Sequence, residues 1–229
     1  MKQYLFATAV GATLFATQSV MAISLDIGSI GGVGGSQLVY HGDGTFSFED
    51  ATAGSSNPGF DFLITGSSGV GMTSIGLPGN LSGIFTIAPP ILSGSFESAV
   101  VTGVGGVLSI FDGTSTFTGI IDWIELTRLG TGNNLNIAGT VNLTGITYLG
   151  GVNDDLLALS AAGSASAVLA FSFPTPGLSI ADLRALPSDS TSYTGDLSAR
   201  LNVPDGGSAL ILLGGCMTLL GAFARYRNS

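Results

Sequence analysis

The side chains that could do acid–base or nucleophilic chemistry are few in this 229-residue chain. His41 is its only histidine and Cys216 its only cysteine. A Ser–His–Asp triad would need His41, yet the sequence has no Gly-x-Ser-x-Gly elbow to present the serine. One histidine and one cysteine also fall short of the usual zinc ligand set. We therefore expect His41 to be a surface side chain in a turn, and we expect no catalytic residue and no cofactor.

Two carboxylates at a fixed separation would be enough for glycoside hydrolysis. Asp122 and Glu125, with Trp123 between them, are the first candidates for such a pair. In a regular strand, however, the period of two puts these carboxylates on opposite faces. Trp123, Tyr148 and Tyr193 could instead stack on a sugar, although the apolar faces around Trp123 and Tyr193 favour core packing. A glycan-active enzyme therefore remains an alternative to a non-enzymatic protein.

Calcium is the metal that other acidic side chains of the chain would suit, because calcium prefers oxygen ligands. The candidate ligands are Asp43, Glu49 and Asp50. No Asp-x-Asp-x-Asp-Gly loop contains them, so we expect no metal site and keep a calcium-dependent carbohydrate-binding module as a further alternative. The pair Asp154 and Asp155 is better explained as the first turn of a helix, where the helix dipole favours negative charge.

Composition and charge exclude several classes of protein. The chain has 15 acidic and 6 basic residues, a net charge of −9, and Lys2 is its only lysine. Nucleic acid is therefore not an expected partner, because binding it depends on basic residues. The 36 glycines lack the three-residue period of collagen. A single cysteine also excludes a disulfide within the chain, so the body must fold by hydrophobic burial.

Apolar and polar residues alternate with a period of two along much of the body, which is typical of strands with one buried face. Residues 115–126 are apolar on both faces and predict a central strand that is covered on both sides. Two short helices are also predicted. Asn153 and Gly163 would begin and end the first, and Ser179 and Asp182 have the spacing of a capping box at the start of the second. The clearest strand segments are 134–148, 164–173 and 192–203.

About nine mostly antiparallel strands with two short helices predict a mainly β fold, either an antiparallel β-sandwich or a rolled sheet. An outer-membrane barrel is the competing interpretation. It fits less well, because a strand such as 117–126 is apolar on both faces and because a single hydrophobic helix follows the body.

The N-terminus has the form of a secretory signal peptide. Lys2 supplies the positive charge, residues 4–16 form the apolar stretch, and Ala22 is the small residue before a cleavage site. We therefore expect export through the Sec machinery and cleavage after Ala22.

The C-terminus contains an uncharged, mostly apolar stretch at residues 208–224. As a helix it would be about 25 Å long, slightly less than the ~30 Å hydrocarbon core of a bilayer. Arg225 and Arg227 follow it and would stay on the cytoplasmic side as stop-transfer residues. The sequence therefore predicts a single transmembrane helix, with the body outside the cytoplasm.

A short motif precedes this predicted helix. It consists of Val203, Pro204, Asp205, Gly206 and Gly207. Motif, helix and basic end, in a chain that begins with a signal peptide, together resemble the PEP-CTERM class of bacterial sorting signals, and in particular its VPDSG-CTERM variant. Gly206 stands where that variant usually has serine. Pro204 holds the chain extended and the glycines keep the backbone accessible, as a protease cleft requires.

The resemblance implies recognition by an exosortase, a membrane-embedded, cysteine-dependent processing protease. It also implies cleavage near the motif and delivery to the cell surface or extracellular matrix of a bacterium that makes exopolysaccharide. The predicted organisation is a signal peptide at 1–22, a β-rich extracytoplasmic domain at 23–202 and a sorting signal at 203–229. We expect a protein that is anchored in the inner membrane before processing and has a structural or adhesive role associated with exopolysaccharide.

Overall fold

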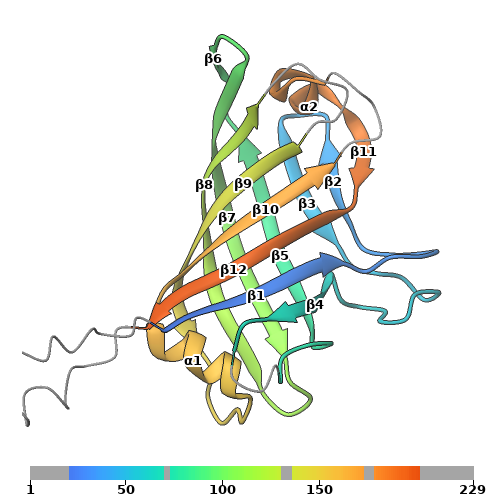
Figure 1. Ribbon diagram of the computed structural model, residues 1–229. Helices are drawn as coiled ribbons and strands as arrows, with labels where there is room; N and C mark the ends of the chain where they lie inside the picture. The colour runs from blue at the N-terminus through green and yellow to red at the C-terminus, as the bar shows by residue number, and fades with distance from the viewer. Residues whose placement is uncertain (1–20, 70–72, 130–135, 173–177, 202–229) are drawn as a thin grey trace, which may run out of the picture. The chain divides into compact units, whose positions relative to one another are not determined.

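The described part of the chain folds into twelve strands and two helices (Figure 1). The computed structural model describes residues 21–69, 73–129, 136–172 and 178–201. Residues 22–201 form one compact unit. The elements are β1 (Met21–Ser29), β2 (Gln37–His41), β3 (Thr45–Glu49), β4 (Phe62–Ser67), β5 (Pro78–Ile87), β6 (Ile91–Ser93), β7 (Phe96–Phe111), β8 (Thr116–Leu129), β9 (Asn136–Thr147), α1 (Asp154–Ala162), β10 (Ala165–Ser172), α2 (Ile180–Ala185), β11 (Pro187–Thr191) and β12 (Tyr193–Leu201).

The sheet closes on itself to form a barrel. β5 pairs with β4 and also with β7, so the pairing runs β1–β4–β5–β7–β8–β9–β10–β12 and returns to β1. Neighbouring strands in this ring run antiparallel. A closed ring leaves none of its own strands with an unpaired edge. The predicted mainly β, antiparallel fold with two short helices is confirmed, and the rolled sheet is closed.

Loops interrupt two long stretches of the barrel wall, so that β1 and β2 form the two parts of one stretch and β3 and β4 the two parts of the next. β1 lies beside β12 and β2 pairs with β11, and only Ser192 separates β11 from β12. β3 pairs with β2, and β4 pairs with β1. The loops 30–36 and 50–61 therefore each interrupt one side of the same wall and project from it together (Figure 1). The backbone N–H of Thr52 donates to the carbonyl of Gly34 at 2.7 Å and joins the two loops.

The inward side chains of the ring are apolar and the outward ones are mostly polar. Strand β10 shows the alternation clearly, because Ala167, Leu169 and Phe171 are buried while Ser166 and Val168 are exposed. Each large apolar side chain that is fully buried contributes about 1.5–3 kcal/mol to folding. The centre of the core is a cluster of aromatic rings whose centroids lie 5.0–6.5 Å apart: Phe46, Phe48, Phe85, Trp123, Phe171 and Tyr193.

Both predicted helices form where their capping residues place them. The Asn153 side chain accepts the backbone N–H of Leu156 at 3.1 Å, and Gly163 ends α1 in the left-handed region at φ 72°. Ser179 and Asp182 form the capping box of α2. The two helices lie at opposite ends of the barrel (Figure 1), where α1 contacts β9 and β12 and α2 contacts β2 and β7.

The expectation of a doubly covered strand at residues 115–126 is wrong. β8 lies in the wall of the barrel, with Phe117, Ile121 and Trp123 inside, while Ile120 points outward and is 52% exposed. A bulge also breaks the period of two. Trp123 pairs with Val141 but Glu125 pairs with the adjacent Thr140, so one extra residue is inserted in β8.

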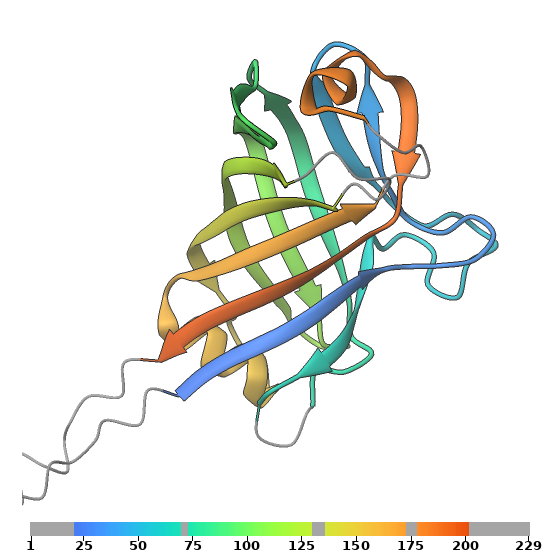
Figure 2. The same cartoon turned by 45° about the horizontal axis from the view of Figure 1, so that its top comes forward.

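The first and last strands of the barrel lie side by side. β1 and β12 are neighbours, and the start of β1 lies next to the end of β12 (Figure 2). Ala22 is exposed, and Ile23 is the first buried side chain, at 4% exposure. Residues 1–20 and 202–229 lie outside the described residues, and with them the predicted membrane helix. Among the described helices, neither is long and apolar enough to cross a bilayer.

Candidate functional site

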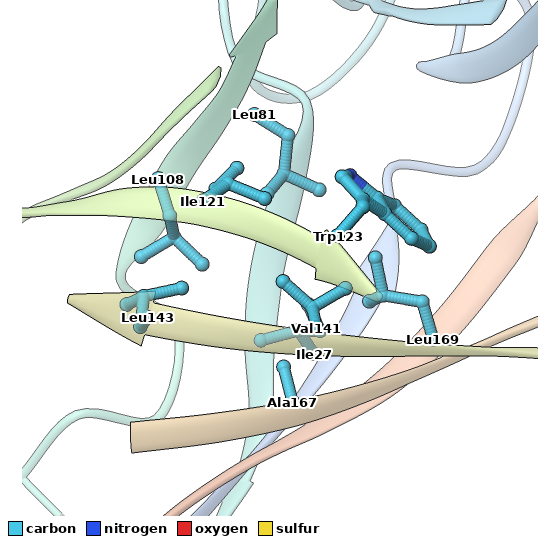
Figure 3. Close-up of a pocket in the computed structure, with 9 residues that line it drawn as sticks. All are labelled: Ile27, Leu81, Leu108, Ile121, Trp123, Val141, Leu143, Ala167 and Leu169. Atoms are coloured by element: carbon cyan, nitrogen blue, oxygen red, sulfur yellow. The ribbon is translucent and has the colours of Figure 1, made fainter. Parts of the chain in front are cut away.

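A small apolar cavity lies inside the barrel (Figure 3). This cavity, in the described part of the barrel, has a volume of about 10 Å³, measured as the space open to the centre of a water molecule, which is room for about one water. Pockets for organic ligands are at least tens of times larger. Nine apolar or aromatic side chains from six strands converge on it: Ile27, Leu81, Leu108, Ile121, Trp123, Val141, Leu143, Ala167 and Leu169.

Trp123 is the one lining side chain with a polar group. Its indole Nε1 is buried without a hydrogen-bond partner among the described atoms. Room for the ring is made by Gly139 on β9, where a Cβ atom would lie 2.2 Å from Trp123 Cζ3. Gly139, which pairs with Leu126 directly after the β8 bulge, is therefore a packing partner of the tryptophan.

Helix α2 is held over one end of the barrel by a buried ion pair. Glu97 on β7 and Arg128 on β8 are each 7% exposed, and Arg128 Nη1 donates to Glu97 Oε1 at 3.1 Å. Glu97 Oε2 accepts the backbone N–H of Ile180 at 2.8 Å, in the first turn of α2. Arg184 on the same helix donates to the carbonyl of Ile87 at 2.9 Å. Two strand–helix contacts thus fix a helix of only six residues.

A second polar network holds α1 at the other end. Asp155 is 1% exposed, and its Oδ2 accepts the Ser67 hydroxyl at 2.8 Å and the Ser74 backbone N–H at 3.2 Å. Ser74 also donates its hydroxyl to the capping Asn153 at 2.8 Å. Asp154 is exposed. Neither carboxylate of the Asp154–Asp155 pair thus needs a metal to explain its position, because Asp155 accepts hydrogen bonds from Ser67 and Ser74 and Asp154 faces water.

Asp61 is the most unusual carboxyl group of the described structure. It is 2% exposed and stands where the loop 50–61 returns to the barrel. Its Oδ2 accepts the backbone N–H of Leu81 at 2.6 Å, while its Oδ1 has no hydrogen-bond partner among the described atoms. Its backbone carbonyl accepts the hydroxyls of Ser36 and of Tyr193, the latter at 2.9 Å. Asp61 therefore links both interrupting loops to β5 and β12.

Burial of Asp61 raises the pKa of its carboxyl group to about 7. The Leu81 N–H works against this by stabilising the charged form, and the neighbouring Asp50 carboxylate raises the pKa further. The same two carboxylates, together with burial, raise the pKa of the Tyr193 hydroxyl. A carboxyl group buried in this way can keep its proton near neutral pH. Because Asp61 is out of reach of a substrate, this is chemistry of stability rather than catalysis.

The bulge in β8 changes the outcome for the predicted glycosidase pair. Asp122 pairs with Asn142 and Glu125 with Thr140, and these partners lie two residues apart on the outward face of β9. Asp122 and Glu125 therefore share the outward face, whereas the sequence period put them on opposite faces. Asp122 is exposed and Glu125 half-buried, on the wall of the barrel.

The three predicted calcium ligands are not brought together. Asp43 lies in the β2–β3 turn, where it accepts the backbone N–H of Thr45 at 2.9 Å, and this bond and one from the Thr45 hydroxyl lower its pKa. Glu49 and Asp50 lie at the far end of β3, about 13 Å along the strand. In the described ranges no group of three or more histidine, cysteine or acidic side chains could hold a metal ion. His41 is exposed at the end of β2 and contacts the Ser47 hydroxyl at 3.0 Å.

The three aromatic residues considered as a sugar platform are core residues. Trp123, Tyr148 and Tyr193 are 6%, 5% and 2% exposed. The Tyr148 hydroxyl donates to Asp112 and accepts the backbone N–H of Asn153. These hydrogen bonds join the β7–β8 turn to the start of α1.

No family model, curated protein or solved structure matches this chain. Of the residues predicted to take part in export, the structure describes Ala22, at the start of β1. The motif Val203–Gly207 and the stop-transfer residues Arg225 and Arg227 lie outside the described residues. Sequence reasoning does not single out Asp61, because one polar residue between Phe60 and Phe62 would lie on the outward face of a regular strand. Its one signal was its position directly after a Gly-, Ser- and Pro-rich loop.

Proposed function

We propose that this is an exported protein that an exosortase-type protease sorts to the cell surface or extracellular matrix, where it has a structural or adhesive role associated with exopolysaccharide. Its partners would be the Sec machinery, the membrane during processing, the processing protease and exopolysaccharide. The proposal begins from the signal-peptide pattern and from the tail that resembles a VPDSG-CTERM sorting signal.

The position of the two processing points relative to the strands supports this proposal most directly. All eight ring strands lie between residues 21 and 201, and the inward face of β1 begins at Ile23. Cleavage after Ala22 would remove only the first two residues of β1, and cleavage at the 203–207 motif would fall after the end of β12. A fold that used either end in its core could not lose that end and keep its stability.

The packed interior supports a structural role. The described cavity has room for about one water, which is too little for an organic ligand. The eight strands of the ring leave no unpaired edge among themselves, and closed sheets resist edge-to-edge aggregation.

The proposal is tested by following the location of two pairs of matched variants. Pro204→Ala should leave the chain unprocessed in the membrane fraction, while Pro58→Ala, an exposed proline of the 50–61 loop, should be processed normally. The double change Arg225→Gln with Arg227→Gln should impair retention before processing, while Arg200→Gln, an exposed arginine on β12, should not. Normal surface delivery of Pro204→Ala and of a chain that lacks residues 208–229 would refute the proposal.

A second candidate function, a glycan-active enzyme, is favoured by one observation. The β8 bulge puts Asp122 and Glu125 on the same outward face, and paired carboxylates are what glycoside hydrolysis requires. Asp122→Asn and Glu125→Gln should each abolish hydrolysis of the host's exopolysaccharide, and Asp26→Asn, an exposed carboxylate on β1, should not. This candidate fails if the unaltered protein releases no sugar.

A further inference from the structure

The two loops that interrupt the barrel wall are joined to the ring at Asp61. The backbone N–H of Asp61 donates to a carbonyl of β5 at 2.9 Å. Its backbone carbonyl accepts the hydroxyl of Ser36, at the end of the loop 30–36, and the hydroxyl of Tyr193, at the start of β12. Asp61 is itself the last residue of the loop 50–61. One residue therefore connects both loops to two strands of the ring.

Hydrogen bonds hold the two loops more than burial does. Between Ala51 and Asp61 no side chain is buried, and Val33 in the other loop is 89% exposed. The Ser36 hydroxyl also accepts the backbone N–H of Ile30 at 2.7 Å, so the side chain that reaches Asp61 closes its own loop as well. Segments with few buried apolar contacts open at a low free energy. The loops can therefore open while the ring stays folded.

The carboxyl group of Asp61 lies where a negative charge would disrupt this junction. The residue is 2% exposed, and its Oδ1 has no hydrogen-bond partner among the described atoms. A buried carboxylate with an unpaired oxygen is costly, whereas the protonated group is tolerated. Movement of residues 60–61 outward would bring the charge into water. The same movement would break the hydrogen bonds from Ser36 and Tyr193 to the Asp61 carbonyl.

Two titratable side chains face Asp61 from the described elements around it. Asp50, the exposed residue after β3, carries a negative charge that favours the protonated form of Asp61. Tyr193 on β12 stays uncharged near neutral pH, because burial and the two carboxylates raise its pKa. The hydrogen-bond partners of Asp61 on β5 and in the loop 30–36 are uncharged. The proton on Asp61 therefore decides how much negative charge the junction must hold.

We propose that Asp61 is a pH-sensitive switch that keeps the loops 30–36 and 50–61 closed on the barrel wall in acid and loosens them above neutral pH. The closed form holds the proton more tightly than the open form, so a rise in pH favours opening. A pKa of about 7 in the closed form and the ordinary 3.8 in the open form make opening up to roughly 90-fold more frequent at pH 8 than at pH 5. Phe62, the first residue of β4, is fully buried and stays in the core.

Amide hydrogen exchange of the full-length chain at pH 5 and pH 8 tests this switch, with each rate divided by that of an unstructured peptide at the same pH. The amides of Ser36 and Thr52 report on the loops, because they donate to the carbonyls of Ile30 and Gly34 when the loops are closed. Their protection should fall at least tenfold from pH 5 to pH 8 in the unaltered protein and change little in Asp61→Asn. Equal protection of these amides at the two pH values in the unaltered protein would overturn the proposal.

Urea separates loop opening from unfolding of the whole barrel. Concentrations below the unfolding transition should speed the exchange of amides in β9 and β10, because global unfolding exposes a large surface. The exchange of Ser36 and Thr52 should not change, because local opening exposes little surface. Loop amides that respond to urea as the ring amides do would show that Asp61 controls only the stability of the whole barrel, and would overturn the proposal.

Two further variants keep the test independent of whether Asp61→Asn folds. Ser36→Ala removes the hydroxyl that reaches the Asp61 carbonyl, so the loop amides should already exchange faster at pH 5. His41→Gln removes the only histidine of the chain, at the other end of β2 from Ser36, and should keep the pH response of the unaltered protein. Unchanged exchange in Ser36→Ala at pH 5, or a pH response that disappears in His41→Gln, would contradict the assignment of the switch to Asp61.

Discussion

The buried carboxyl group of Asp61 should make this protein lose stability as pH rises through neutrality. The change to make is Asp61→Asn, which fixes the side chain in an uncharged form and keeps an oxygen for the Leu81 N–H. The folded-state pKa of about 7 lies above the ordinary value of 3.8. The stabilisation is therefore complete below pH 3.8 and is lost as the pH rises through about 7.

The size of this effect follows from proton linkage. Each tenfold change in proton affinity corresponds to about 1.4 kcal/mol, so an ionised Asp61 lowers the free energy of unfolding by up to ~4 kcal/mol. Of this, about 3 kcal/mol falls between pH 5 and pH 8. Water screens the charge of Asp61 only weakly, because the residue is 2% exposed. Hydrogen bonds lower the pKa values of Asp43, Asp112 and Asp182. The stability that these carboxylates contribute is therefore lost only at acidic pH and does not change between pH 5 and pH 8.

Urea unfolding of the purified exported protein at pH 5 and pH 8 measures this directly. The unaltered protein should lose about 3 kcal/mol between the two, and Asp61→Asn should lose little. The loss of stability for Asp50→Asn should lie between the losses for the unaltered protein and for Asp61→Asn, because the change removes the neighbouring charge but leaves Asp61 buried. Asp26→Asn, on an exposed carboxylate, should behave as the unaltered protein. Equal pH dependence in the unaltered protein and in Asp61→Asn would refute the reasoning.

Two further predictions concern packing and the ion pair under α2. Gly139→Ala should destabilise the barrel by about 2 kcal/mol or more, because the added Cβ atom would lie 2.2 Å from Trp123. Gly31→Ala, whose Cβ atom would have nothing within 4 Å, is the matched control. Equal melting temperatures for the two variants would contradict the tight packing of Gly139 against Trp123. Glu97→Ala should lower the free energy of unfolding by about 3–5 kcal/mol, because it leaves Arg128 buried and unpaired. The double change Glu97→Leu with Arg128→Met should restore much of that stability. Amide hydrogen exchange in α2 should rise in Glu97→Ala, and unchanged exchange would show that the ion pair does not hold the helix.

Local sequence patterns predicted the local structure of this protein well. The Asn153 and Gly163 caps and the Ser179–Asp182 capping box fixed both helices, because these side chains satisfy backbone groups within a few residues of themselves. Alternation in β10 predicted its buried face for the same reason, since the period of a strand is a local property.

Features that depend on pairing between distant strands could not be predicted in this way. Alternation identifies which face of a strand is buried, but an apolar face fits a sandwich and a closed ring equally. The closing pair of β5 with β7 shows only in the structure. One extra residue in β8 moved Glu125 to the face of Asp122, and a period of two cannot reveal such a bulge. The burial of Asp61 could not be predicted either, because it depends on two loops and β12 meeting at one point.

The central claim, that the chain is exported and its tail is recognised and cut, is tested most directly by mass spectrometry of both ends of the mature protein. We expect the protein on the cell surface or in the matrix to begin at Ile23 and to end within the 203–207 motif, without Arg225 and Arg227. A surface protein that still begins at Met1 and ends at Ser229, or a chain found only in the cytoplasm, would contradict it.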